Sequence, residues 1–353
     1  MDYSLELFDR IEVIKTTNNK YDLENNSYIA FSGGKDSTVL HYLIDMALPG
    51  NNIPRVYVDT GIGLNMISEF VDQLSKNDKR IIIIKSDIPI KQSLEKYGYP
   101  FKSKSHSFLL EKYQRLGFTT GVKNYLGIGD KPHLRMCPKV LKYQFTEDFK
   151  IKISDMCCKI MKEKPMEKWG IKNNKSIVIT GIMAEEGGRR SKAKCIVNSN
   201  KTMFFNPLSK SNKEFEEWLI NNYKLKICDI YYPPYNAERT GCKGCPFALH
   251  LQHELDFLEK YLPIERKQCE IIWKPIYEEY RRIGYRLRKE ETLCQKEKPK
   301  GWQLPWTQDL FLLVINTLIK SNKLVYHPWP PGHNLLNKHC YYTLMNWQDK
   351  TNH

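Results

Sequence analysis

The chain has 353 residues, enough for one large or two modest domains, and 41% of them are hydrophobic, which suffices for a packed core. Lysine and arginine outnumber aspartate and glutamate by 55 to 40, and the resulting net charge of +15 favours polyanionic partners such as nucleic acid and nucleotides. Lysine-rich chains also arise in genomes of low G+C content, so the charge alone leaves contact with nucleic acid open.

Neither the first residues nor the longest apolar stretch has the pattern of a targeting or membrane segment. Residues 1–13 carry acidic side chains where a secretory signal would carry basic ones, and residues 310–319 are too few to span a bilayer. We expect a cytoplasmic protein with no membrane partner. In that reducing compartment the ten cysteines are expected to ligate metal, take part in redox chemistry or be buried, and not to form disulfides.

In the first half of the chain, apolar β-branched runs alternate with amphipathic helical patterns. This alternation predicts strands at 27–31, 55–59, 80–86 and 176–182, and helices at 36–46 and 65–74. Buried strands separated by helices are typical of a parallel sheet in an α/β fold. We therefore predict a doubly wound, Rossmann-like α/β domain over residues 1–230, with a mostly helical insertion at about 105–170.

The rest of the chain is predicted to be helical up to a change in composition near residue 295. Helices are expected at 212–223, 248–262 and 264–290, the last interrupted near Pro275. We assign residues 231–294 to a cysteine-rich helical region. Residues 295–353, which are rich in aromatic residues and proline, are assigned to a small C-terminal appendage.

A loop rich in glycine and hydroxyl side chains follows the first predicted strand and opens the first helix. Such a loop presents free backbone N–H groups and the positive end of a helix dipole. Gly33 and Gly34 allow close approach of a phosphate, Lys35 adds a positive charge, and Asp36 could cap the helix or hold Mg²⁺. Hydroxyl donors are supplied by Ser32, Ser37 and Thr38. For two glycines alone, an ordinary strand–turn–helix junction would explain the pattern equally well.

Cys242 and Cys245 form a CxxC motif, which presents two thiolates to one metal centre. Two further ligands are needed, and Cys137 and Cys269 complete a workable set of four. The adjacent pair Cys157 and Cys158 is a rival source of ligands. An iron–sulfur cluster, structural zinc and free thiols are all open on this pattern, whereas burial or chance is the better reading of Cys195, Cys228, Cys294 and Cys340.

The hexapeptide Ser-Gly-Gly-Lys-Asp-Ser at 32–37 resembles the PP-loop of ATP pyrophosphatases, the adenine nucleotide α-hydrolase superfamily. Further matches resemble the phosphoadenosine phosphosulfate (PAPS) reductase family within it. The segment VYVDTGIG (56–63) is similar to the family's Asp-Thr-Gly after the second strand, which implies that Asp59, Thr60 and Gly61 lie over the nucleotide. The segment TGIMAEEGGRR (180–190) aligns Gly181, Glu186 and Arg190 with family positions, although the family's arginine and serine are Met183 and Gly187 here.

The segment RTGCKGCPF (239–247), with Cys137 upstream, resembles the iron–sulfur members of the same family. This resemblance implies a [4Fe–4S] cluster beside the nucleotide, held by Cys137, Cys242, Cys245 and Cys269. Many members carry a Cys-Cys pair at the first ligand position, which reads Met136-Cys137 here. The matches run from about Ser27 to Arg286.

The family's reductases carry a C-terminal Glu-Cys-Gly-x-His whose cysteine attacks the substrate. Cys340 lacks those neighbours, so the resemblance favours sulfur insertion, as in DNA-phosphorothioation and RNA-thiolation enzymes. We expect binding of ATP (or APS/PAPS) and Mg²⁺, with Lys35, Asp36 and Asp59 as catalytic residues. Nucleic acid and a sulfur-donor protein are the expected partners. The alternatives are a sulfonucleotide reductase and a non-catalytic, zinc-containing nucleic-acid-binding protein.

Two segments combine basic and aromatic residues in a way that suits nucleic-acid backbones and stacked bases. They are residues 278–289 and 326–342. The first also has the spacing of a helix packed against a core.

Overall fold

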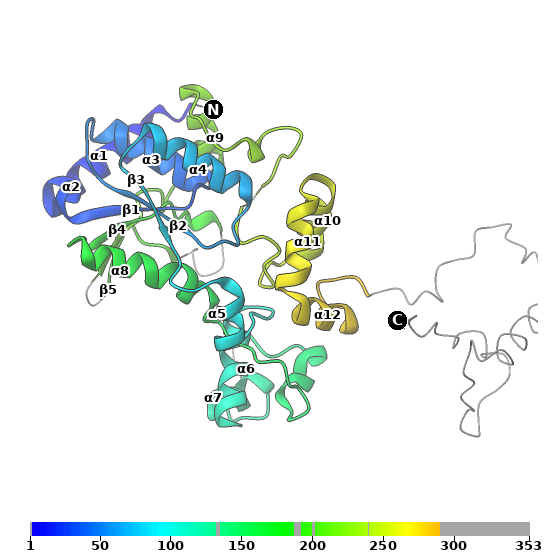
Figure 1. The fold of residues 1–353 in the computed structure, drawn as a ribbon. Helices are drawn as coiled ribbons and strands as arrows, with labels where there is room; N and C mark the ends of the chain where they lie inside the picture. Colours follow the sequence, from blue (N-terminus) through cyan, green and yellow to red (C-terminus); the bar gives the residue numbers. More distant parts are fainter. Residues whose placement is uncertain (1, 132–134, 187–191, 200–201, 239, 290–353) are drawn as a thin grey trace, which may run out of the picture. The chain divides into compact units, whose positions relative to one another are not determined.

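A mostly parallel six-stranded sheet, in the order β3-β2-β1-β4-β6-β5, forms the centre of the fold (Figure 1). The strands are β1 (Ser27–Phe31), β2 (Arg55–Asp59), β3 (Ile81–Lys85), β4 (Ile177–Ile179), β5 (Ile196–Ser199) and β6 (Thr202–Phe205). Neighbouring strands are parallel except β5 and β6, which pair antiparallel. The sheet confirms the predicted α/β class.

The structure is a computed structural model that describes residues 2–131, 135–186, 192–199, 202–238 and 240–289. The chain divides into two units, Met1–Arg288 and Lys289–His353. The predicted appendage at 295–353 lies outside the described residues, as do Cys294 and Cys340. The boundary predicted at residue 230 stays a prediction.

The helices occupy the connections between the strands and the region after the sheet. Before and within the first βα units they are α1 (Ser4–Tyr21), α2 (Leu23–Asn26), α3 (Lys35–Ala47), α4 (Asn65–Asn77) and α5 (Ile90–Tyr97). The insertion contains α6 (Lys104–Leu116), α7 (Thr120–Leu126) and α8 (Lys164–Lys172), and the later helices are α9 (Lys213–Tyr223), α10 (Leu251–Tyr261), α11 (Pro263–Ile272) and α12 (Lys274–Ile283). The helical insertion and the interruption near Pro275 are thus confirmed, because Pro275 opens α12 where its missing N–H is not needed.

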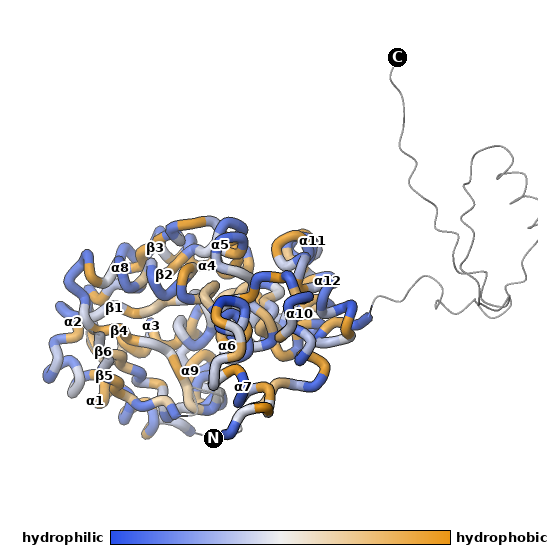
Figure 2. Tube along the Cα trace, turned by 90° about the horizontal axis from the view of Figure 1, so that it is seen from below, coloured by the Kyte–Doolittle hydropathy of each residue, from blue (hydrophilic) through white to orange (hydrophobic). Residues whose placement is uncertain are grey.

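Helices cover both faces of the sheet because side chains alternate along each strand. Ile29 of β1 packs in one hydrophobic cluster with Leu40 of α3 and Phe215 of α9. Its neighbour Tyr28 points to the opposite face and packs near Trp169 of α8. Hydrophobic residues accordingly line the central strands, while hydrophilic residues mark the outer turns (Figure 2). Among the described residues, no helix combines the length and the apolar character needed to cross a membrane.

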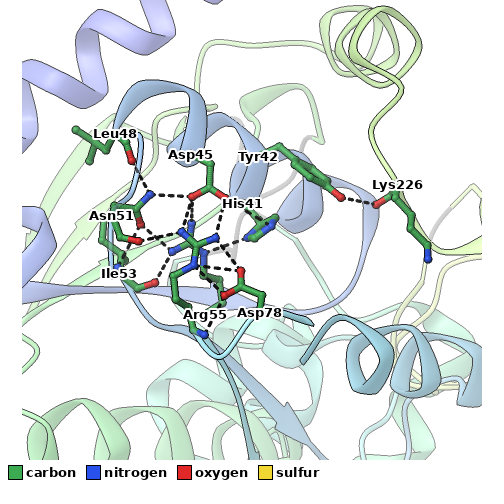
Figure 3. Close-up of polar contacts among 10 residues, drawn as sticks. His41, Tyr42, Asp45, Leu48, Asn51, Ile53, Arg55, Asp78 and Lys226 are labelled. Atoms are coloured by element: carbon green, nitrogen blue, oxygen red, sulfur yellow. Dashed lines mark hydrogen bonds and ion pairs between the residues drawn. The ribbon is translucent and has the colours of Figure 1, made fainter. Parts of the chain in front are cut away.

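A buried charge network fixes α3 to the start of β2 (Figure 3). Arg55 is fully buried, and its guanidinium donates from Nε to His41 Nδ1 (3.0 Å), from Nη1 to Asn51 Oδ1 (2.8 Å) and from Nη2 to Asp45 Oδ1 (2.6 Å). Arg80 donates to both oxygens of the same Asp45. Because a buried guanidinium is tolerated only when it is paired, this network holds α3, and with it the loop that opens α3, in register with the sheet.

The network predicts a pH-dependent stability. Burial lowers the pKa of His41 to about 4, with Arg55 adding to the effect. The folded protein thus binds fewer protons than the unfolded chain, so stability is complete above pH 6.5 and decreases as the pH falls towards 4. We expect His41 to account for about 2 kcal/mol of the loss in unfolding free energy between pH 7 and pH 5.

Urea unfolding of the wild type and of His41→Gln at both pH values measures this contribution. The variant should lose about 2 kcal/mol less than the wild type over this interval. An equal loss in both proteins would contradict the assignment. Buried His106, whose pKa is also lowered to about 4 by burial, contributes equally to both proteins and cancels in the comparison.

Candidate functional site

The glycine-rich loop lies where β1 ends and α3 begins, at the carboxyl edge of the sheet. Gly33 has a left-handed φ of +70°, and Gly34 precedes α3 without a side-chain cap on the helix. The loop is closed by its own hydroxyls: Ser37 Oγ accepts from Ser32 N (3.1 Å) and Thr38 Oγ1 donates to Gly34 O (2.9 Å). The hydroxyls of Ser37 and Thr38 therefore shape the loop, and their predicted contact with a phosphate stays a prediction.

Gly33 lies against α4 so closely that no side chain fits. A Cβ added there would lie 2.6 Å from Val71 Cγ2 and 2.8 Å from Ile67 Cγ2. The chain therefore requires glycine at position 33 for two reasons, the positive φ and the contact with α4.

Loops from the two strands that pair with β1 lie at the same edge of the sheet as the glycine-rich loop. At the end of β2, Asp59 Oδ1 accepts a hydrogen bond from Gly61 N (3.0 Å), and Thr60 is buried. After β4, a Cβ on Gly181 would lie 2.9 Å from the backbone oxygen of Asp36. The structure thus brings Gly181 against the glycine-rich loop, while the place of Asp59, Thr60 and Gly61 over a nucleotide stays a prediction. Glu186 ends a 3₁₀ turn at Ala184–Glu186, and Arg190 lies outside the described residues.

Tyr231 and Thr240 connect the glycine-rich loop to the CxxC motif, and the sequence analysis did not identify either. The Tyr231 hydroxyl accepts a hydrogen bond from Lys35 N (3.0 Å) and bonds to Thr240 Oγ1 (2.5 Å). Burial raises the pKa of Tyr231 to about 12, so the phenol stays protonated at neutral pH. Thr240 lies two residues before Cys242, so the first amide of α3 is linked to the cysteine loop through two side chains.

A second connection joins the cysteine loop to the loop after β2. Lys243 N donates to Ile62 O (2.9 Å), and Gly63 and Cys242 form an antiparallel bridge. The CxxC motif is therefore bonded directly to the loop after β2, and the residues before it are linked through Tyr231 to the glycine-rich loop. A cysteine site beside a bound nucleotide stays a prediction.

The Cys245 thiol lies near three other cysteines, two of which come from a distant part of the chain. Burial, and after it the Cys242 thiol, raises the pKa of Cys245, and Cys157 and Cys158 act in the same direction. Lys162 lies on the π-helical turn that follows Cys158, and its pKa is raised chiefly by Cys242. The pair that the sequence marked as a rival source of ligands is therefore the one that lies near the CxxC motif.

Cys137 and Cys269, the other two predicted ligands, lie in different surroundings. Cys137 is buried in the insertion, where burial raises its pKa to about 11 and Tyr125 and Lys102 are its neighbours. Cys269 lies underneath the cysteine loop, where a Cβ on Gly244 would come within 2.9 Å of its Sγ. Cys269 of the predicted set thus lies against the CxxC loop, Cys137 has Tyr125 and Lys102 as neighbours, and the set of four stays a prediction.

The resemblance implies an iron–sulfur cluster, which needs four thiolate ligands from this chain. Four thiols fit such a cluster chemically, because thiolates are its ordinary ligands. Among the described residues, no three His, Cys, Asp or Glu side chains stand close enough to hold a single metal ion. Metal ligation therefore stays a prediction.

An open cavity of about 490 Å³ lies beside this site, between α4 and strands β2 and β3. Asp59, Glu69 and Asp72 contribute carboxylates to its lining. Carboxylates repel phosphate, so the cavity does not match the phosphate site expected at the glycine-rich loop.

A parallel α/β sheet whose strand loops converge on a helix-opening glycine loop defines a domain of the phosphate-loop type. Residues 26–127 match the family model of the phosphoadenosine phosphosulfate reductase domain. This match confirms the resemblance predicted from the motifs, for the part of the chain that contains the glycine-rich loop and Asp59. No curated protein sequence matches the chain.

Three solved structures illustrate what the fold is similar to. The PAPS reductase of Candida auris in a phosphate complex is 12% identical with a TM-score of 0.41, covering 66% of this chain and 87% of that one. The FMN adenylyltransferase of Candida glabrata in complex with ATP is 12% identical with a TM-score of 0.39, covering 69% of this chain and 64% of that one. The U34-tRNA thiolase of Methanococcus maripaludis with its [4Fe–4S] cluster is 17% identical with a TM-score of 0.32, covering 76% and 78%.

The two reasons for glycine at position 33 can be separated by a matched pair of variants. Gly61 has nearly the same φ, +68°, but nothing lies within 4 Å of an added Cβ. We expect Gly61→Ala to lower the unfolding free energy by about 1 kcal/mol. Gly33→Ala should lower it by about 2–4 kcal/mol, because overlap with α4 adds to the strain. Equal effects in urea unfolding would show that the contact with α4 does not matter.

Proposed function

We propose that the chain is a nucleotide-dependent sulfurtransferase. It binds ATP at the glycine-rich loop, activates an acceptor oxygen by adenylation, and allows sulfur to replace that oxygen. One observation carries the proposal. Lys35 N bonds to the Tyr231 hydroxyl, which bonds to Thr240, two residues before the CxxC motif. The match of residues 26–127 to the PAPS reductase domain supports the nucleotide part.

The proposed reaction has two steps and no net redox change. The acceptor oxygen attacks the α-phosphorus of ATP, the bond to the β-phosphate breaks, and pyrophosphate leaves. A sulfide nucleophile then forms a bond to the acceptor atom, and AMP leaves with the oxygen. The backbone amides of the loop and Lys35 stabilise negative charge on the phosphates, while Asp36 and Asp59 are the carboxylates available to hold Mg²⁺.

We propose nucleic acid as the acceptor on the basis of charge. A net charge of +15 attracts polyanions. A sulfur-donor protein and a cytoplasmic setting belong to the same proposal.

The first test is turnover of ATP to AMP and pyrophosphate in the presence of candidate RNA or DNA. Lys35→Ala should lower kcat/KM at least about 100-fold, because it removes a charge from the phosphate site. Lys91→Ala, on the exposed face of α5, is the matched control and should behave as the wild type. Pyrophosphate release that is unaffected by Lys35→Ala would refute the phosphate-site assignment.

A sulfonucleotide reductase is the second candidate, favoured by the description of the matched domain. It predicts sulfite release from APS or PAPS with a thiol donor, and no dependence on nucleic acid. Sulfite in this assay, together with the absence of AMP and pyrophosphate from ATP, would replace the sulfurtransferase proposal.

We further propose that Cys157, Cys158, Cys242 and Cys245 are the ligands of a [4Fe–4S] cluster. The carrying observation is that burial raises the pKa of Cys245 and that Cys242, Cys158 and Cys157 all add to the rise, whereas the neighbours of Cys137 are Tyr125 and Lys102. Iron analysis of anaerobically purified protein should find about four iron atoms per chain. Replacing Cys157 and Cys158 together by serine should abolish iron binding, while Cys137→Ser should retain it.

Loss of iron in Cys137→Ser, with iron retained in the double serine variant, would instead support the set of Cys137, Cys242, Cys245 and Cys269. Zinc in place of iron would favour a structural metal site and, with no turnover of ATP, the non-catalytic alternative. Thermal unfolding of each variant shows whether loss of metal follows from loss of the fold.

A further inference from the structure

A buried carboxylate lies beside the glycine-rich loop and has no place in the proposed reaction so far. Glu216 of α9 is 2% exposed, and its Oε2 lies 3.0 Å from Lys35 Nζ. The carboxyl group of Asp36 also lies within hydrogen-bonding reach of Glu216. Two carboxyl groups next to each other in a buried place are costly, so Lys35 is the group that offsets the charge of Glu216.

The fold of α9 explains why Glu216 is buried. Asn212 caps the helix by accepting a hydrogen bond from Phe215 N (2.8 Å). Phe215, Leu219 and Ile220 then pack into the hydrophobic cluster on that face of the sheet. Glu216 lies on the same inner side of the helix, where an apolar residue would pack without cost.

The neighbouring Glu217 provides a natural comparison. Its side chain is 65% exposed, and its Oε1 lies 3.9 Å from the same Lys35 Nζ. An exposed partner at that distance contributes little. Glu216 is therefore the carboxylate that sets the position of the Lys35 side chain.

The charges of Glu216, Asp36 and Lys35 affect any anion that binds at the glycine-rich loop. Burial raises the pKa of Glu216 to about 8, Asp36 adds to the rise and Lys35 opposes it. The Lys35 ammonium group is already paired with Glu216, and a phosphate bound at the loop would have to share it with that carboxylate.

We infer that Glu216 is a positioning residue that holds Lys35 on the α9 side of the loop and yields it to a phosphate oxygen when a nucleotide binds. The inference rests on the proposed function, since it assumes that the loop binds phosphate. Two consequences follow. Glu216 weakens the binding of anions, because they compete with it for Lys35, and it fixes the direction from which Lys35 reaches the reacting phosphate.

The test compares wild type, Glu216→Gln and Glu217→Gln as full chains, with inorganic pyrophosphate as the probe in calorimetry. A chelator is present so that no metal contributes. At about pH 9, where the Glu216 carboxyl is ionised, Glu216→Gln should bind pyrophosphate about tenfold more tightly, because Lys35 is no longer paired with a carboxylate and is free for the anion. The same variant should lower kcat for ATP about tenfold, because Lys35 loses its fixed position. Glu217→Gln should match the wild type in both measurements.

A double variant separates positioning from plain charge removal. In a Lys35→Met background, Glu216→Gln should leave pyrophosphate affinity unchanged, because the residue acts through Lys35. The same tenfold tightening in that background would overturn the inference. This comparison also serves if Glu216→Gln alone is unstable in thermal unfolding, since the double variant leaves no unpaired buried charge.

The outcomes distinguish this inference from the proposed function. Pyrophosphate binding by the wild type that Glu216→Gln does not alter would overturn the role of Glu216 and leave the phosphate site standing. No pyrophosphate binding by wild type or any variant would overturn the phosphate site, and the inference with it.

Discussion

The hydrogen bond from Lys35 N to the Tyr231 hydroxyl is the contact on which the architecture of the site depends. A free amide at the start of a helix normally faces solvent or a ligand. Here one such amide is used to hold a tyrosine, which in turn holds Thr240 and the cysteine loop. Ser32 N and Gly34 N donate within the loop, to Ser37 Oγ and Ser32 Oγ. The bond from Lys35 N is thus the one that links the loop to the segment that carries the cysteines.

The second constraint lies at the other end of α3. Arg55, Arg80 and Asp45 anchor the last turns of that helix to the starts of β2 and β3 (Figure 3). With one end of α3 fixed by buried charges and the other by the tyrosine, the helix has little freedom to shift. A rigid helix start is what an anion site requires, because its backbone donors then need no rearrangement when the anion binds.

Much of this arrangement could be predicted because it is local. The strands at 27–31 and 55–59 were predicted with the bounds that the structure shows, since short β-branched runs between helices allow few other readings. The glycine-rich loop could be recognised because six consecutive residues define it. Strands β5 and β6 were not predicted. They are four residues each and partly exposed, so they lack the buried apolar run that marks the others.

What could not be predicted depends on long-range contacts. Tyr231 meets Lys35 across 196 residues, and no spacing in the sequence indicates that pairing. The same holds for the cysteines: Cys137 was included in the predicted set because it precedes a predicted helix among basic residues. In the folded insertion, burial raises the pKa of Cys157 and Cys242 of the CxxC motif adds to the rise, whereas Cys137 lies beside Tyr125. Residue type restricts which side chains can ligate a metal, but the path of the insertion decides which of them can meet. A site assembled from three separate segments is therefore defined by the fold, and the sequence motifs identify its candidates.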